Sequence, residues 1–253
     1  MREVSAPVRA LCSKLIDYAG LFPPAALVLP AVIDNYERYL ASRDGWILNR
    51  LVLPESVIGS APIRPGWRIS LLIENREPAA PLPPEVETFE SKGAGPFTRT
   101  TYVEGGDGDL LKVRTGGLKP ENIPGSEEIA EFLCSAALAK KPFKATAGLH
   151  HAIRAERALT YAADSPRAVM HGFVNVFAAA AFAWHGAPRE TVAAVLNETD
   201  PRAFCVAENA VAWNGRSLIT AQIEDSRANF AHSFGSCSFE EPVADLRELG
   251  WLP

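Results

Sequence analysis

Cysteine is scarce in this sequence and never occurs in closely spaced pairs. The four cysteines, Cys12, Cys134, Cys205 and Cys237, are widely separated, so the chain has neither the C-x-x-C pairs of a zinc site nor the cysteine density of a disulfide-stapled secreted domain. The opening stretch MREVSAPVRA lacks the apolar core of a signal peptide. These absences predict reduced thiols and a cytoplasmic, bacterial setting.

Long apolar runs and an excess of positive charge are also missing. The most apolar stretch, FVNVFAAAAFAW at 173–184, is shorter than the ~20 residues that cross a bilayer, and it contains Asn175. The formal net charge is −5 at pH 7, which excludes general attraction to nucleic acid or to an anionic membrane surface. We therefore expect neither nucleic acid nor a membrane as partner, and we interpret 173–184 as a buried helix.

The composition is that of an ordinary globular protein. Hydrophobic residues make up 47% of the 253 residues and charged residues 22%, and no internal repeat or long linker divides the chain. Barrels of the α/β class fold as single units at about 250 residues. We expect one domain over residues 1–253, and a homo-oligomer is compatible with this sequence.

Eight short apolar segments have the length and composition of strands. They lie at 15–22, 46–53, 68–73, 85–91, 99–105, 109–117, 142–148 and 230–239. The segments 30–41 and 126–141 have helical periodicity, and the second starts with Ser126 followed by acidic residues that suit a helix N-terminus. Alternating strands and helices predict an α/β fold, and eight strands predict a TIM-like (β/α)8 barrel.

Two stretches make this barrel irregular. The proline-rich segment 77–85 and the short GAGPF at 93–97 leave little room for helices, so we expect helices to be missing around strands 3–5. The segment 205–218 has turn residues between apolar runs and predicts a hairpin outside the barrel wall. The pattern at 219–230 predicts a helix after it. We expect this hairpin and helix as an insertion before the last strand.

Positive charge gathers on two neighbouring strand segments. In DLLKVRTGG, Lys112 and Arg114 alternate with apolar residues, and in PFKATAG, Lys144 and Thr146 do the same, so each strand has one apolar face and one polar face. In a barrel the polar faces point inward near the C-terminal strand ends, where barrel enzymes keep their active sites. We expect the three cations to converge in one pocket and bind a small anionic molecule, with Thr115 beside them.

The alternative is a structural role for these cations. Buried charge is costly unless it is paired, and Glu90 or Glu104 on neighbouring segments would neutralise the lysines. Replacing Lys144 with Met separates the two roles. A lysine that serves a ligand loses activity with little change in stability, whereas an ion-paired lysine costs stability when it is removed.

The segment KATAG (144–148) resembles the lysine strand of the deoxyribose-phosphate aldolase family, in which a Schiff-base lysine stands in a K-T-S-T-G context. This resemblance implies that Lys144 is the nucleophile, that Thr146 hydrogen-bonds the substrate, and that Lys112 is a second cation that favours the unprotonated amine. In that family the second lysine lies on the strand after the nucleophile, whereas Lys112 lies on the strand before Lys144. Asp17 is a candidate acid or base, or a carboxylate that orients the lysine.

A second resemblance extends over nearly the whole chain. It rests on YAGLFPPA (18–25), KVRTGG (112–117), FKATAGLHH (143–151), HGFVNVF (171–177) and FGSCSFEEPVADL (234–246). Together these segments resemble a family of uncharacterised bacterial proteins. That resemblance implies no particular activity.

The last strand segment ends in a turn of small residues. Gly235, Ser236 and Ser238 can offer backbone N–H and hydroxyl groups to a phosphate or carboxylate, as barrels often do after their last strands. The same turn also fits an ordinary helix cap, in which Ser238 and Glu241 form a capping box, and the two roles can coexist. Cys237 is a candidate nucleophile, but no sequence pattern pairs it with a histidine.

Four polar residues near the predicted barrel mouth are further candidates for substrate binding. His150 and His151 follow the glycine that ends the lysine strand, and His171 and Asn175 lie one helical turn apart. The last two also fit a satisfied polar pair in the core. Three histidines suggest a metal, yet no H-x-H or H-E-x-x-H spacing accompanies them, and we assign no metal ligand.

The leading hypothesis is a barrel enzyme of the lyase or aldolase type. It acts on a small anionic carbonyl or phosphorylated compound by lysine-assisted carbon–carbon bond chemistry or enolisation. We expect Lys144, Lys112 and Asp17 to be catalytic, and we expect no cofactor. One alternative is a metal-assisted hydrolase or isomerase that uses the three histidines. The other is a small-molecule-binding protein without catalytic activity.

Overall fold

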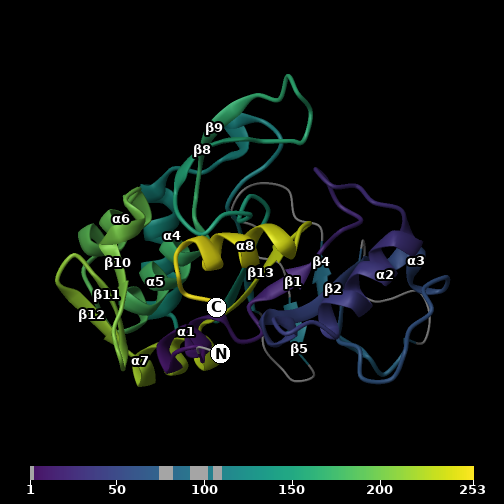
Figure 1. The fold of residues 1–253 in the computed structure, drawn as a ribbon, viewed down its shortest axis with the longest axis horizontal. Helices are drawn as coiled ribbons and strands as arrows, with labels where there is room; N and C mark the ends of the chain where they lie inside the picture. Colours follow the sequence, from purple (N-terminus) through teal and green to yellow (C-terminus); the bar gives the residue numbers. More distant parts are fainter. Residues whose placement is uncertain (1–2, 74–81, 92–101, 105–109) are drawn as a thin grey trace.

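One curled sheet organises the chain. The computed structural model describes residues 3–73, 82–91, 102–104 and 110–253. The sheet has the order β5–β4–β3–β2–β1–β13–β7–β6 (Figure 1). Its strands are β1 (Ile16–Tyr18), β2 (Leu48–Pro54), β3 (Ile69–Ile73), β4 (Val86–Ser91), β5 (Tyr102–Glu104), β6 (Leu111–Arg114), β7 (Phe143–Thr146) and β13 (Ala231–Ser236). Each of the eight strand segments expected from the sequence overlaps one of them.

Seven of these strands run parallel and form a half-barrel. The eighth, β5, pairs with β4 in the antiparallel direction, which differs from the barrel of eight parallel strands that the sequence predicted. The reason lies in the connection. A parallel crossover takes a dozen or more residues, whereas residues 92–101 provide only ten between β4 and β5. The architecture is therefore α/β, with the two edges of the described sheet at β5 and β6.

Eight α-helices lie in the described residues, and most of them pack around this sheet. They are α1 (Ala6–Cys12), α2 (Leu29–Leu40), α3 (Glu55–Ile58), α4 (Ser126–Leu138), α5 (Phe173–Trp184), α6 (Arg189–Asn197), α7 (Thr220–Asn229) and α8 (Glu240–Glu248). Short 3-10 helices stand at Gly45–Ile47, Pro120–Asn122 and Pro201–Ala203. The helices predicted at 30–41 and 126–141 are confirmed as α2 and α4. The helices expected to be missing around strands 3–5 fall mostly on 74–81, 92–101 and 105–109, which lie outside the described residues.

The core forms where the apolar faces of the strands meet the helices. Helix α5 is buried along nearly its whole length and packs against α4, α6, α7 and β13, which confirms the interpretation of 173–184. Phe143 of β7 makes edge-to-face contacts with Phe132 of α4 and Phe230. The apolar face of β7 thus points to the helices, and its lysine face points into the half-barrel. No helix in the described part of the chain is long and apolar enough to cross a membrane.

Two small sheets stand apart from the main one. The insertion before β13 is a three-stranded antiparallel sheet of β10 (Phe204–Val206), β11 (Ala210–Trp213) and β12 (Arg216–Ile219), followed by α7. The predicted hairpin at 205–218 is thereby confirmed. The second is a two-stranded ribbon of β8 (Ala155–Ala158) and β9 (Arg167–Met170), seen at the top of Figure 1. Its strands are largely exposed, so they lack the apolar alternation that would predict them.

The ends of β6 and β7 approach each other through two glycines. A Cβ added to Gly148 would lie 2.8 Å from the Gly116 Cα atom, and one added to Gly116 would lie 2.7 Å from the Gly148 Cα atom. Gly148 also has φ +79°, in the left-handed region that favours glycine. The two glycines after the lysine strands therefore let the backbone turn sharply at the mouth of the half-barrel.

Gly148→Ala is expected to destabilise the protein by more than Gly186→Ala. Both glycines have a left-handed backbone, but a Cβ at Gly186 would meet no atom within 4 Å. Left-handed strain alone costs about 1–2 kcal/mol, and the clash at Gly148 adds about 1–3 kcal/mol of overpacking. Urea unfolding of both variants measures the difference. Equal losses would show that the approach to Gly116 is easily relieved.

Candidate active site

A cavity of about 290 Å³ opens at the C-terminal ends of the parallel strands. Its walls come from β2, β3, β4, β6, β7 and β13 and from the loop after β1, and Leu159 and Met170 of the β8–β9 ribbon close one side. Lys112, Arg114 and Lys144 all line it. The three cations thus share one cavity, as the alternation of polar and apolar residues on β6 and β7 predicted. This is also the end at which barrel enzymes hold their substrates.

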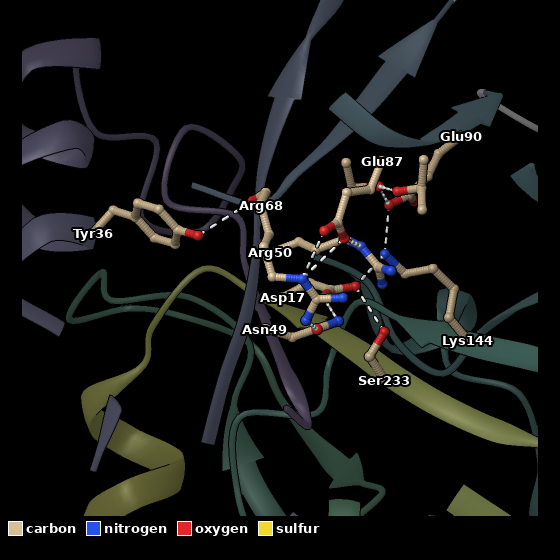
Figure 2. A network of polar contacts seen from close by, with 11 residues as sticks. Asp17, Tyr36, Asn49, Arg50, Arg68, Glu87, Glu90, Lys144 and Ser233 are labelled. Carbon is tan, nitrogen blue, oxygen red and sulfur yellow. Dashed lines mark hydrogen bonds and ion pairs between the residues drawn. The ribbon is translucent and has the colours of Figure 1, made fainter. Parts of the chain in front are cut away.

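Lys144 is the centre of a buried network of charges (Figure 2). Its side chain is 1% exposed, and its Nζ atom donates to Asp17 Oδ2 at 2.6 Å and to Glu90 Oε1 at 2.5 Å. The sequence predicted a neighbourhood of like charges around this lysine. The structure instead places two carboxylates on it, because strands β1 and β4 curl toward β7. Such an environment favours the charged ammonium.

Asp17 is completely buried and fully hydrogen-bonded. Its Oδ2 atom also accepts from Ser233 Oγ at 2.8 Å, and its Oδ1 atom accepts from Asn49 Nδ2 at 2.6 Å. Asn49 in turn accepts from Arg68 Nη1 at 2.5 Å. Figure 2 shows how these partners surround the carboxylate from different strands. Of the roles expected for Asp17, orienting a lysine is the one that this geometry fits.

Glu90 connects the two lysines. Its Oε1 atom takes the bond from Lys144, and its Oε2 atom accepts from Lys112 Nζ at 3.1 Å. Ser70 Oγ donates to the same carboxylate at 2.5 Å. Burial opposes ionisation, but the two ammonium groups and these hydrogen bonds outweigh it and hold the pKa of Glu90 below its ordinary value. Glu90 is the partner that the ion-pair interpretation named. The other, Glu104, belongs to β5, and its side chain lies outside the described residues.

Every parallel strand contributes at least one side chain to this cluster. The members are Asp17 (β1), Asn49 (β2), Ser70 (β3), Thr88 and Glu90 (β4), Lys112 (β6), Lys144 (β7) and Ser233 (β13). Two carboxylates face two ammonium groups, so the formal charges cancel. A second group beside it, in which Arg50 and Arg68 both donate to Glu87 (Figure 2), joins the cluster through the bond from Arg68 to Asn49.

The two lysines differ in access to the cavity. The Lys112 side chain is 13% exposed, against 1% for Lys144. Arg114 lies two residues farther along β6, at the mouth, where its Nε atom donates to Gly116 O at 2.9 Å. Thr146 lines the cavity on β7. Thr115 is buried and donates to Ala147 O at 2.6 Å, so its hydroxyl fastens β6 to β7.

A thiol, an imidazole and a carboxylate meet beside the cavity. Cys237 Sγ lies 3.9 Å from His150 Nε2, and Glu241 Oε2 lies 3.2 Å from His150 Nδ1. Burial alone would lower the pKa of His150, but its contacts with Cys237 and Glu241 raise it to about 9. No sequence pattern paired Cys237 with a histidine. A signal existed, since both residues follow the glycine-containing ends of strands that are neighbours in the sheet.

The side chains of His151, Asn175 and Ser236 do not line the cavity. His151 Nδ1 lies 3.1 Å from Asp245 Oδ2. Asn175 accepts from the Arg154 backbone N–H and donates to the carbonyl of Val195, as a satisfied core residue does. Ser236 Oγ lies 3.4 Å from His150 Nδ1. Only His150 lines the cavity among the four polar residues that were expected at the barrel mouth, His150, His151, His171 and Asn175.

His171 is held as a neutral imidazole. Arg154 Nη1 lies 3.1 Å from its Nδ1 atom and can only donate, so Nδ1 must accept and Nε2 must donate to Pro124 O at 2.8 Å. Burial, together with the Arg154 charge, lowers the pKa of His171 to about 4. In the described residues, no group of three or more His, Cys, Asp or Glu side chains is arranged to hold a metal ion, so the three histidines do not converge.

The turn after β13 serves as a helix cap. Ser238 Oγ accepts from the Glu241 backbone N–H at 3.2 Å, which is half of the capping box expected from the sequence. The Glu241 carboxylate instead contacts His150 and accepts from Tyr161 OH at 3.1 Å. Gly235 lines the cavity. The turn thus combines a cap with one wall of the site.

Comparison with known proteins finds no match to this chain among protein-family models, curated proteins or solved structures. The proposals that follow therefore depend on the geometry and chemistry of the site.

Lys144→Met is expected to destabilise the protein by about 3–5 kcal/mol, because it leaves Asp17 and Glu90 buried without their shared cation. Arg38→Met is the matched control. It breaks an ion pair with Glu240 of similar length, 2.6 Å, whose side chains are 57% and 63% exposed, and such a pair contributes at most about 1 kcal/mol. Chemical denaturation compares the two variants. Similar losses would contradict a structural role for the buried pair.

Stability is expected to fall as the pH is lowered from about 6.5 to about 4. The folded-state pKa of His171 lies below its unfolded value, so the neutral form stabilises the fold above pH 6.5, and this contribution is lost as the pH falls through the folded pKa. The effect is at most about 3 kcal/mol. Unfolding curves across this range measure it. His171→Gln should flatten the dependence, and an unchanged slope would assign it to other groups.

Proposed function

We propose that this protein is an enzyme that acts on a small anionic carbonyl compound by amine chemistry at Lys112. The observation that carries this proposal is the division between the two lysines that share Glu90. Lys112 reaches the cavity with a partly exposed side chain, whereas Lys144 is enclosed between two carboxylates. A nucleophile must meet its substrate, and this difference favours Lys112.

The roles of the lysines are thereby exchanged relative to the sequence expectation. Lys144 becomes the second cation, buried behind Lys112 on the next strand. The order of the two lysines along the chain then agrees with the deoxyribose-phosphate aldolase family, but KATAG, which resembles the nucleophile strand of that family, contains the second lysine. Asp17 then acts on Lys144 as a positioning residue, since it holds the ammonium at 2.6 Å.

The chemistry follows from the neighbours of Lys112. Attack of its Nζ atom on a carbonyl carbon forms a C–N bond, and the carbonyl oxygen takes up two of the three protons of the Lys112 ammonium and leaves as water. The product is a cationic iminium. Glu90, at 3.1 Å from Nζ, would lie beside that positive charge and stabilise it. The iminium then draws electrons from the adjacent C–C or C–H bond, which is the step shared by aldol cleavage and enolisation.

Arg114 supplies selectivity for an anion. Its guanidinium lies at the mouth of the same cavity, two residues beyond Lys112 on β6. A carboxylate or phosphate on the substrate would meet it there, while the carbonyl carbon reaches toward Lys112. Thr146 on β7 offers a hydroxyl to the bound compound.

We further propose that the half-barrel is an irregular TIM-like barrel. Support comes from the strand order, because β6, β7, β13, β1, β2, β3 and β4 follow one another around the sheet as they do along the chain, with the chain ends joined at β13 and β1. The site then occupies the position that this architecture reserves for catalysis.

Borohydride trapping tests the amine chemistry. The protein is incubated with pyruvate, an anionic carbonyl compound, or with acetaldehyde, a neutral one, and reduced with sodium borohydride. Peptide mapping should place the adduct on Lys112, and Lys112→Met should abolish it. Adducts confined to exposed lysines such as Lys119 and Lys141 would contradict the proposal.

Arg114→Gln tests the anion site by a ratio. Loss of the guanidinium should lower the yield of the pyruvate adduct by about tenfold or more, because one charge-assisted contact contributes about 1.5–3 kcal/mol, while the acetaldehyde adduct stays unchanged. A parallel fall of both adducts would assign Arg114 to the structure of the mouth and not to the ligand.

A further inference from the structure

A second nucleophile lies on the other side of the same cavity. Cys237 follows β13 and His150 follows β7, and both line the cavity wall. The Cys237 Sγ atom is 3.9 Å from His150 Nε2 and 4.0 Å from Nδ1. Glu241, in the first turn of α8, approaches the ring at Nδ1. Three separate elements thus bring a thiol, a base and a carboxylate together.

The contacts of the His150 imidazole determine which of its ring nitrogens carries a proton. The Glu241 carboxylate lies 3.2 Å from Nδ1, and an ionised carboxylate can only accept, so Nδ1 carries a proton. Nε2 is then the nitrogen that can accept the thiol proton. This is the order of groups, nucleophile to base to orienting carboxylate, by which enzymes activate a cysteine.

Glu241 is itself held in place. Tyr161 OH donates to its Oε2 atom at 3.1 Å, and the Glu241 backbone N–H donates to Ser238 Oγ at 3.2 Å. Burial opposes the ionisation of Glu241, but its contacts with His150 and Tyr161 outweigh it and hold the pKa of Glu241 below its ordinary value. Burial likewise opposes the charged form of His150, but its contacts with Cys237 and Glu241 raise the pKa of His150. The charged groups that face His150 therefore favour an imidazolium beside the sulfur.

We propose that Cys237 is a nucleophilic cysteine, activated by His150 and oriented through Glu241, that bonds covalently to an electrophilic carbon of a small molecule in the cavity. The thiol proton passes to His150 Nε2 and the sulfur attacks the carbon. With an aldehyde, the S–C bond forms as the C=O π bond opens, and the oxygen takes the proton back from His150 to give a hemithioacetal. The step needs no oxidant and no leaving group, and it does not depend on the amine of Lys112.

The competing explanation is that Cys237 is an inert core thiol. Its residue is 5% exposed, and buried cysteines usually behave as small apolar side chains. The chain contains its own reference, because Cys205 is exposed. If accessibility alone decided reactivity, Cys205 would react first and Cys237 last.

Alkylation with iodoacetamide at pH 7 decides between them. The thiolate displaces iodide to form an S–C bond, and peptide mapping over time gives a rate for each cysteine. We expect Cys237 to react at least as fast as Cys205. An ordinary thiol is only a few per cent ionised at pH 7, so His150→Gln should slow Cys237 by about tenfold or more. Glu241→Gln should slow it by a smaller factor.

His151→Gln is the matched control. His151 forms a similar contact with a carboxylate of α8, Asp245 at 3.1 Å, but it does not line the cavity. The Cys237 rate should therefore not change in this variant. Cys12, which is completely buried, reports on folding, since its modification marks an unfolded sample. If a variant unfolds, the pH dependence of alkylation is measured in the unaltered protein instead. There, Cys237 should react at a lower pH than Cys205.

Two results would overturn the proposal. One is a Cys237 that stays unmodified while Cys205 reacts at every pH. The other is an unchanged Cys237 rate in a folded His150→Gln protein. Neither result affects the outcome of borohydride trapping at Lys112, so the proposals for the two nucleophiles are tested independently.

Discussion

The interior of the half-barrel depends on one ammonium group and the two carboxylates that hold it. Lys144 on β7 reaches Asp17 on β1, two strands away, and Glu90 on β4, five strands away. A single side chain thus joins strands that lie far apart in the order β4–β3–β2–β1–β13–β7. Such an arrangement stabilises only when it is complete, because each charge is buried and depends on the others. The curvature of the sheet and the set of charged side chains inside it therefore depend on each other.

This coupling explains why the same residues suit both folding and chemistry. A buried, charge-balanced cluster is rigid, since each member has its hydrogen-bond partners in place. A reactive group at the edge of this cluster is therefore held rigidly as well. Lys112 and the mouth of the cavity stand at this border, with solvent on one side and the cluster on the other.

Much of the fold could be predicted from period-two and helical patterns, because these are local. The eight strands and the helices α2, α4 and α5 follow from them. The β8–β9 ribbon did not, since its exposed strands bury little on either face, and the direction of β5 depends on connection length and not on strand composition. The partners of the site residues could not be predicted, for a different reason. Lys144 and Asp17 are 127 residues apart, and Cys237 and His150 are 87 apart. The alternation of polar and apolar residues predicts which face of its strand each lysine occupies. Only the order of the strands in the folded sheet determines which side chains the lysines contact.

The shared position of Glu90 between two ammonium groups has a consequence for any reaction at Lys112. An iminium has the same single positive charge as the ammonium that it replaces, so covalent attachment of a carbonyl compound would change the size and shape of the group beside Glu90 while its charge stayed constant. The buried charges of the cluster would then keep the same arrangement throughout the reaction. A site of this kind holds its counter-charge ready before the substrate arrives.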